Sequence, residues 1–294
     1  MADLPLLMAV PNVSEGRDAR ALEAIERAFH PAAFLDLHVD ADYGRAVFTL
    51  AAEQGRLAEA LLSGGREVLA RVNLNRHDGL HPCVGALDVM PVVYLDEERR
   101  GAACAEVLTA AALIGEELEL PVFLYGELAT RPEQRERAYL REGGWRGLGR
   151  RVESGELVPD YGPANIHPTA GALLATARPP LVAFNLDLKT DDVELARRIA
   201  AGLRESGGGL PGVRALGLYL PDRRRTQVST NVHDYRATPL SAIVDHVRRQ
   251  AEVVEAELVG LAPEAAFEDF PEDVRLRGFS PERHLIENAL LTLR

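Results

Sequence analysis

The sequence predicts an α/β protein of the α+β kind, built from two subdomains that each hold a mixed or antiparallel-rich sheet with helices on one face. The chain has 294 residues, of which 47% are apolar, so it can bury the core of one large or two medium domains. Its predicted elements follow a split β-α-β order, and the second half repeats that order. We therefore expect subdomains at residues 1–179 and 180–294.

Apolar periodicity predicts the elements of the first half. Strands are expected at residues 6–10, 34–39, 45–51, 89–95 and 122–125, and helices over Leu22 to Phe29, 57–72 and 99–118. The segment 130–158 is rich in Arg, Glu and Gly and contains the only tryptophan, Trp145. Its charge run is typical of a solvated surface, so we expect a partly helical surface insertion.

The second half gives the same order of strands and helices. Strands are expected at residues 181–186, 213–220, 226–232 and 258–261, and helices at 191–206, at 239–256 and from Ser280 onward. Two such subdomains predict a ligand site in the cleft between them.

Composition excludes several classes of function. A net charge of −12 argues against a general nucleic-acid or membrane surface, although a local basic pocket remains compatible with a small anionic ligand. Two cysteines, Cys83 and Cys104, are too few for a disulfide framework, and no cleavable leader or stretch of about 20 apolar residues is present. We expect a cytoplasmic protein.

The residues with the most chemical potential lie between Asn75 and Val89, just before an apolar strand. Gly79 and Pro82 argue against a helix there, so His81 is expected in a rigid bend. Four interpretations are open: His81 with His77 as metal ligands, Cys83 as a nucleophile, a histidine that only bonds backbone, and His81 as a general acid/base. The last needs no large pKa shift, because histidine titrates near neutral pH.

A second unusual stretch, residues 162–171, is too rich in Pro and Gly for regular structure. A rigid, uncharged loop of this kind can present backbone donors and a flat face to a planar ring. The alternative is a plain interdomain linker.

Seven separated motifs together resemble the glutamate formiminotransferase domain of formiminotransferase-cyclodeaminase, in that family's order and over nearly the whole chain. They are Val10-Pro11-Asn12-Val13-Ser14-Glu15-Gly16, His81-Pro82 with Gly85-Ala86-Leu87-Asp88-Val89, Leu124-Tyr125-Gly126-Glu127, Pro159-Asp160-Tyr161-Gly162-Pro163, Ala183-Phe184-Asn185-Leu186, Gln227-Val228-Ser229-Thr230-Asn231 and Leu258-Val259-Gly260-Leu261.

The resemblance implies an N-terminal and a C-terminal formiminotransferase subdomain with a folate tunnel between them, usually in a homodimer. It implies transfer of the formimino group of N-formimino-L-glutamate to N5 of tetrahydrofolate, a co-substrate, in histidine degradation, with no metal. His81 falls on the family's catalytic histidine. The family's folate-binding segment falls on Gly162, Pro163, Ala164, Asn165, Ile166, His167, Pro168, Thr169, Ala170 and Gly171.

Both substrates are carboxylates, which arginine forks match. Our candidates for holding them are Arg45, which stands close to Asp40, and Arg178, just before the second subdomain; Asn12, at the end of a strand, could orient a ligand or merely cap a turn. Surface ion pairs are the alternative role for these arginines.

The chain departs from the family pattern beside His81 and in the preceding hairpin. Leu80 and Cys83 stand where the family usually has an acid and an arginine, and Tyr43-Gly44 where it usually has His-Asn. These departures bear on substrate identity more than on fold.

Two other functions stay open. One is an ATP-dependent 5-formyltetrahydrofolate cycloligase, although no phosphate loop is present, and the other is a folate-binding protein without catalysis. The chain stops at Arg294 without a cyclodeaminase domain, so a separate enzyme is expected to consume the formimino-folate.

Overall fold

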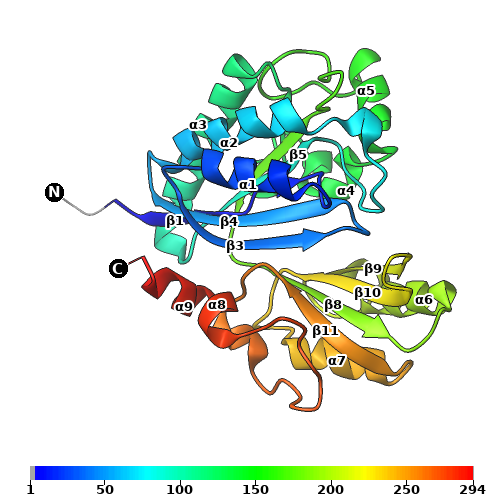
Figure 1. The fold of residues 1–294 in the computed structure, drawn as a ribbon. Helices are drawn as coiled ribbons and strands as arrows, with labels where there is room; N and C mark the ends of the chain where they lie inside the picture. The colour runs from blue at the N-terminus through cyan, green and yellow to red at the C-terminus, as the bar shows by residue number, and fades with distance from the viewer. Residues whose placement is uncertain (1–3, 294) are drawn as a thin grey trace. The chain divides into compact units, whose positions relative to one another are not determined.

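The computed structural model describes residues 4–293. The chain forms two compact units, one ending at Pro179 and the other beginning at Pro180 (Figure 1). Both have the predicted α+β composition, so the fold class is confirmed.

The first unit is built on a seven-stranded sheet. Its strands are β1 (Leu6–Ala9), β2 (Asn12–Val13), β3 (Ala33–Asp40), β4 (Arg45–Glu53), β5 (Leu87–Val93), β6 (Val122–Leu124) and β7 (Leu173–Arg178). Its α-helices are α1 (Ala19–Ala28), α2 (Leu57–Arg71), α3 (Arg100–Glu117), α4 (Arg137–Leu140) and α5 (Gly144–Glu153).

The centre of this sheet has the predicted split β-α-β arrangement. Both β1 and β2 pair with β4 on one side and β5 on the other, and β3 extends the sheet beyond β4. Beyond the predicted strand 6–10, Asn12–Val13 continues the first strand after a break. Strand β7, which was not predicted, adds to β5 in parallel, and β6 adds to β7.

Alternate residues of the central strands enter two different cores, as the two-residue period of a strand requires. Met90 and Val92 of β5 lie in the core that α1, α2 and α3 cover, whereas Val89 lies in a second core on the other face. That second core contains Leu140 and Leu148. The charge run of segment 130–158 is largely exposed and the segment is partly helical, as predicted, but its apolar residues also cover a sheet face, which was not predicted.

The second unit contains a four-stranded antiparallel sheet in the order β11-β8-β10-β9. Its strands are β8 (Val182–Leu188), β9 (Val213–Leu220), β10 (Arg225–Val232) and β11 (Val253–Val259), and its α-helices are α6 (Val193–Leu203), α7 (Leu240–Arg248), α8 (Pro281–His284) and α9 (Ile286–Leu291). Helices α6 and α7 pack their apolar residues on one face of the sheet.

One helix of this unit is shorter than predicted. The helix expected over 239–256 ends at Arg248, and β11 begins at Val253 and pairs with β8. The glutamates and alanines of this stretch favour a helix locally, but pairing along β8 satisfies the backbone groups of an edge strand. Across the described residues, no helix combines the length and the apolar character needed to cross a membrane.

Candidate active site

The loop that carries His81 is held against the turn between β3 and β4. The His81 amide donates to the Tyr43 carbonyl at 3.2 Å. Two glycines permit this approach: a Cβ on Gly44 would lie 2.7 Å from the Cα of Gly79, and Gly44 has a φ of +62°. The predicted non-helical bend is confirmed, and the departure at Tyr43-Gly44 is part of its construction.

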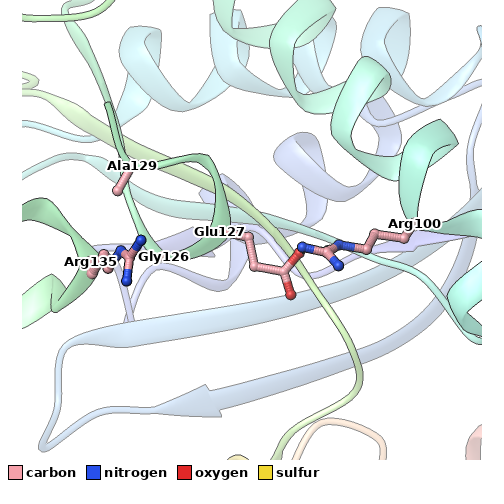
Figure 2. Close-up of a pocket in the computed structure, with 5 residues that line it drawn as sticks. All are labelled: Arg100, Gly126, Glu127, Ala129 and Arg135. Carbon is pink, nitrogen blue, oxygen red and sulfur yellow. Dashed lines mark hydrogen bonds and ion pairs between the residues drawn. The ribbon is translucent and has the colours of Figure 1, made fainter. Parts of the chain in front are cut away.

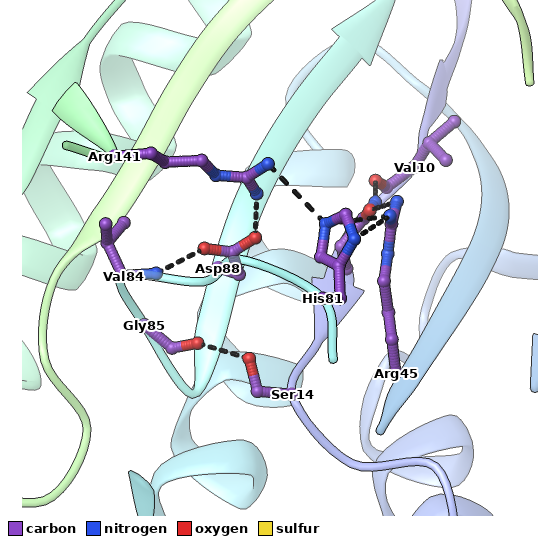
Figure 3. Close-up of polar contacts among 9 residues, drawn as sticks. Val10, Ser14, Arg45, His81, Val84, Gly85, Asp88 and Arg141 are labelled. Atoms are coloured by element: carbon purple, nitrogen blue, oxygen red, sulfur yellow. Dashed lines mark hydrogen bonds and ion pairs between the residues drawn. The ribbon is translucent and has the colours of Figure 1, made fainter. Parts of the chain in front are cut away.

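Two guanidinium groups converge on the His81 ring from different elements (Figure 3). Nη1 of Arg45, the first residue of β4, lies 3.0 Å from His81 Nε2, and Nη1 of Arg141 lies 3.5 Å from the same nitrogen. Arg45 also donates through Nη2 to Oδ1 of Asn12. Asn12 is in turn oriented by donating to the Val10 carbonyl at 2.7 Å.

Arg141 is fixed by a buried acid. Its Nη2 pairs with Oδ2 of Asp88, and the two side chains are 10% and 3% exposed. The other carboxylate oxygen of Asp88 accepts from the Val84 amide at 2.8 Å. The ion pair therefore ties segment 130–158 to the start of β5, with hydrogen bonds to both partners as a buried pair requires.

The surroundings of His81 keep its ring neutral. Burial lowers the pKa of His81 well below its ordinary value, and the positive charges of Arg45, Arg141 and Arg137 lower it further. Burial also lowers the pKa of Arg45, to about 9, with the Arg141 charge next in effect. A neutral imidazole at physiological pH is the form that accepts a proton.

Cys83 lacks the environment of a nucleophile. The residue is 8% exposed, and burial, with the nearby Asp88 charge, raises the pKa of its thiol to about 11. The reactive thiolate is therefore scarce at neutral pH. The structure gives no support to the interpretation of Cys83 as a nucleophile.

The segment 162–171 packs directly on the His81 loop and its flanks. The Leu74 amide donates to the Thr169 carbonyl at 2.8 Å, and the Ala86 amide donates to the Ala170 carbonyl at 2.9 Å. At Gly171, with φ +69°, a Cβ would lie 2.1 Å from the Val84 carbonyl oxygen. The segment lies inside the first unit, between α5 and β7, so the interdomain-linker alternative is wrong.

The four predicted carboxylate-site residues are placed differently from one another. Arg45 contacts the His81 ring, and Asn12 accepts a hydrogen bond from the other amino group of Arg45. Asp40 is buried and accepts from the Tyr43 amide at 2.8 Å, which makes it a residue of the hairpin turn. Arg178, at the end of β7, donates to the Pro179 carbonyl at 2.9 Å, and burial lowers its pKa to about 10.

Sequence reasoning missed Arg141 and Asp88 as site residues. Asp88 belongs to the motif Gly85-Ala86-Leu87-Asp88-Val89 and is the only acid of the apolar strand β5, and a buried acid at that place calls for a cationic partner. Arg141 carries no local signal, because it is one of several arginines in a charged segment.

A separate pocket of about 420 Å³ lies where β6 ends (Figure 2). Its lining includes Arg100 and Glu127, which form a 2.9 Å ion pair, and Arg135. Glu127 also accepts from the Tyr94 hydroxyl at 2.7 Å. The carboxylate of Glu127 is thus paired with Arg100, and this pocket shares no lining residue with the His81 cluster.

The fold and the His81 cluster define a two-unit α+β protein with a neutral, arginine-flanked histidine suited to proton transfer. Comparison with known proteins identifies the family. The N-terminal subdomain of the formiminotransferase domain matches residues 6–178, and the formiminotransferase domain matches residues 183–272. The chain belongs to the formiminotransferase family, which confirms the resemblance, and it is a transferase.

Curated relatives cover the chain almost completely. The glutamate formimidoyltransferase of Streptococcus pyogenes serotype M1 is 34% identical, over 97% of this chain and 99% of that protein. The enzyme of the same name from Thermoplasma acidophilum is 32% identical, over 98% of each chain. The formimidoyltransferase-cyclodeaminase of Mus musculus is 35% identical over 90% of this chain, but only 51% of that longer protein is matched.

Proposed function

We propose that this chain is a glutamate formimidoyltransferase that moves the formimino group of N-formimino-L-glutamate to N5 of tetrahydrofolate, in histidine degradation. The observation that carries the proposal is the neutral His81 ring between Arg45 and Arg141, in a chain whose full-length relatives bear that enzyme name. Tetrahydrofolate is a co-substrate in this reaction.

His81 acts as the single acid and base of the transfer. N5 of the folate attacks the amidine carbon, so an N5–carbon bond forms and a tetrahedral intermediate results. The neutral imidazole takes the N5 proton and then delivers a proton to the glutamate nitrogen, whose bond to carbon breaks. One group that both accepts and donates a proton suffices, and the products are 5-formimino-tetrahydrofolate and glutamate.

The folate is assigned to the segment 162–171. Its hydrogen bonds to the His81 loop, from Thr169 and Ala170, support this assignment, because they hold the two segments at a fixed separation. The donor carboxylates are assigned to Arg45 and Arg178, with Asn12 and Asp40 in supporting positions. Arginine suits this role because its planar fork matches a carboxylate in two hydrogen bonds.

The cellular setting follows from the same reaction. We propose a cytoplasmic homodimer that binds small-molecule substrates and no nucleic acid or membrane. A separate cyclodeaminase would consume its product.

A paired-substrate assay on the purified chain tests the proposal. Tetrahydrofolate and N-formimino-L-glutamate are supplied together, and glutamate release and 5-formimino-tetrahydrofolate are followed in the same sample. Equal amounts of both products are expected, and His81→Ala should reduce turnover about 10²–10⁴-fold with binding largely retained. Folate binding without glutamate release would contradict the proposal and would direct the assay to 5-formyltetrahydrofolate with ATP.

A further inference from the structure

Arg45 carries a partly buried positive charge that forms no ion pair with any of the described residues. Its hydrogen bonds go to a ring nitrogen of His81 and to the side-chain oxygen of Asn12, which are both uncharged. Its Nε is buried without a hydrogen-bond partner, and no carboxylate of residues 4–293 lies within ion-pair distance of it. Buried charges in proteins are normally paired, so this guanidinium is prepared for an anion from outside the chain.

The same contact occupies the nitrogen that has to accept a proton. A guanidinium only donates hydrogen bonds, so the atom that it contacts must supply a lone pair. His81 Nε2 lies 3.0 Å from Arg45 Nη1 and 3.5 Å from Arg141 Nη1, whereas Nδ1 is 3.5 Å from Arg45. The lone pair on Nε2 is therefore occupied by arginine donors before substrate arrives.

The two arginines differ in what holds them. Arg141 is paired with Asp88 and has no free charge to offer. Arg45 is held only by neutral acceptors, and a hydrogen bond between a guanidinium and a carboxylate is roughly twice as strong as one between neutral groups. An incoming carboxylate will therefore draw Arg45 toward itself and leave Arg141 in place.

We propose that Arg45 is a specificity-determining residue: it binds a carboxylate of the donor substrate, and that binding releases Nε2 of His81 to act as the base. This inference rests on the proposed function for the identity of the donor. Proton transfer would then begin only when a carboxylate-bearing donor is bound. Arg45 would raise kcat as well as affinity for such donors, because its contribution appears in the reacting complex.

Electrostatics support the same coupling. The charged and titratable groups around His81 are Arg45, Arg137, Arg141, His77, Tyr43 and Asp88, and the charge of Arg45 is the largest influence after burial that lowers the pKa of His81. A carboxylate on Arg45 cancels part of that influence. The imidazole therefore becomes a stronger base when the donor is present.

The first test measures the pKa of His81 directly by NMR in the full-length chain with isotope-labelled histidine. The titration is run alone and with saturating L-glutamate as the carboxylate probe. We expect glutamate to raise the pKa of His81 by about one unit, the size of effect that one neighbouring charge commonly has. In Arg45→Met the pKa of His81 should be higher than in the parent without ligand, and glutamate should not change it. In Arg45→Lys glutamate should still raise the pKa of His81.

Arg66→Met is the matched control, because Arg66 lies on α2 in an exposed ion pair with Glu117. It should respond to glutamate as the parent does. If saturating glutamate leaves the pKa of His81 unchanged in the parent chain, the inference is overturned. This measurement on the parent does not depend on whether any variant folds.

The second test compares donors. Formamidine carries the same reacting carbon without a carboxylate and releases ammonia on transfer. The parent should show a much lower kcat with formamidine than with N-formimino-L-glutamate, and Arg45→Met should bring the two kcat values together. If the ratio of kcat for N-formimino-L-glutamate to kcat for formamidine is the same in the parent and in Arg45→Met, the inference is overturned.

The two tests also separate this inference from the proposed function. Turnover of N-formimino-L-glutamate with an unmoved His81 pKa leaves the function standing and overturns the role of Arg45. A pKa that rises with glutamate in a protein without turnover on that donor supports the role of Arg45 and rejects the proposed donor.

Discussion

At the scale of single residues, the site is a small set of buried charges that are only partly balanced. Asp88 forms an ion pair with Arg141, whereas no carboxylate among the described residues forms one with Arg45. The neutral His81 is the consequence, because burial and the neighbouring cations Arg45, Arg141 and Arg137 disfavour its protonated form. A site of this kind combines a base that works at neutral pH with a receptor for an anion.

The pH dependence of activity follows from this balance. Only neutral His81 can accept a proton, and an ordinary histidine loses that form below about pH 6.5. Because the pKa of His81 is lowered, kcat/KM should stay flat as pH falls through 6.5 and decline only at more acidic values. A pH profile from 4.5 to 8.5, corrected for enzyme inactivation, measures this. A decline already centred at or above about 6.5 would contradict it.

The thiol of Cys83 gives a second prediction at this scale. Its pKa of about 11 leaves it protonated, so Cys83→Ser should keep turnover within a few-fold of the parent. Steady-state kinetics with both substrates measure the effect, with His81→Ala as the inactive reference. Total loss of activity in a folded Cys83→Ser protein would restore the thiol as a nucleophile.

At the scale of elements, the site depends on loops that approach each other at backbone distance. Gly44 packs against Gly79 where the β3–β4 turn contacts the His81 loop. Gly171 packs against the Val84 carbonyl where segment 162–171 contacts the same loop. Neither contact leaves room for a side chain. The positions of the His81 loop and segment 162–171 relative to each other are therefore set by glycines.

Gly171→Ala tests this at the element scale. The substitution adds a backbone clash to the cost of a positive φ, so it should weaken tetrahydrofolate binding and lower the free energy of unfolding. Gly155→Ala is the matched control, because Gly155 has φ +76° and open space around its Cβ. The control should cost only about 1–2 kcal/mol and leave folate affinity unchanged. Urea unfolding and calorimetric folate titration compare the two, and equal effects would refute the steric role.

At the scale of the molecule, each unit has a core of its own. The core between the first sheet and α1, α2 and α3 contains Phe48, and the core of the second unit contains Phe184. The only tryptophan, Trp145, lies in the first unit. It provides an optical probe that reports on that unit alone.

Phe184→Ala is expected to destabilise the second unit selectively. The loss of a fully buried phenylalanine costs about 3–5 kcal/mol, which should move the second unit's unfolding to lower urea. The urea midpoint of unfolding measured by Trp145 fluorescence should then equal that of the parent. Far-UV circular dichroism should show an additional unfolding transition at a lower urea concentration. Phe48→Ala should do the reverse and shift the fluorescence midpoint. A joint shift of both signals in Phe184→Ala would mean that the two units unfold as one.

Much of the fold was predictable because its strongest signals are local. The period of apolar residues placed β9 at Val213–Leu220, and it placed α2 within one residue of its end. Predictions failed where the structure of a segment depends on contacts with residues distant in the sequence. Glutamate and alanine before Val253 favour a helix, yet the stretch pairs with β8, and the charged segment 130–158 hides apolar residues that cover a sheet face.

The sequence by itself determined the split β-α-β order, the family resemblance and the non-helical bend of His81, because these depend on spacing along the chain. Only the tertiary structure decided which charges meet. Arg141 is 60 residues from His81 and 53 from Asp88, and no sequence pattern selects it from its neighbouring arginines. Electrostatic interactions act through space and depend on burial, so the neutral histidine and the unpaired Arg45 emerge only when distant segments are brought together.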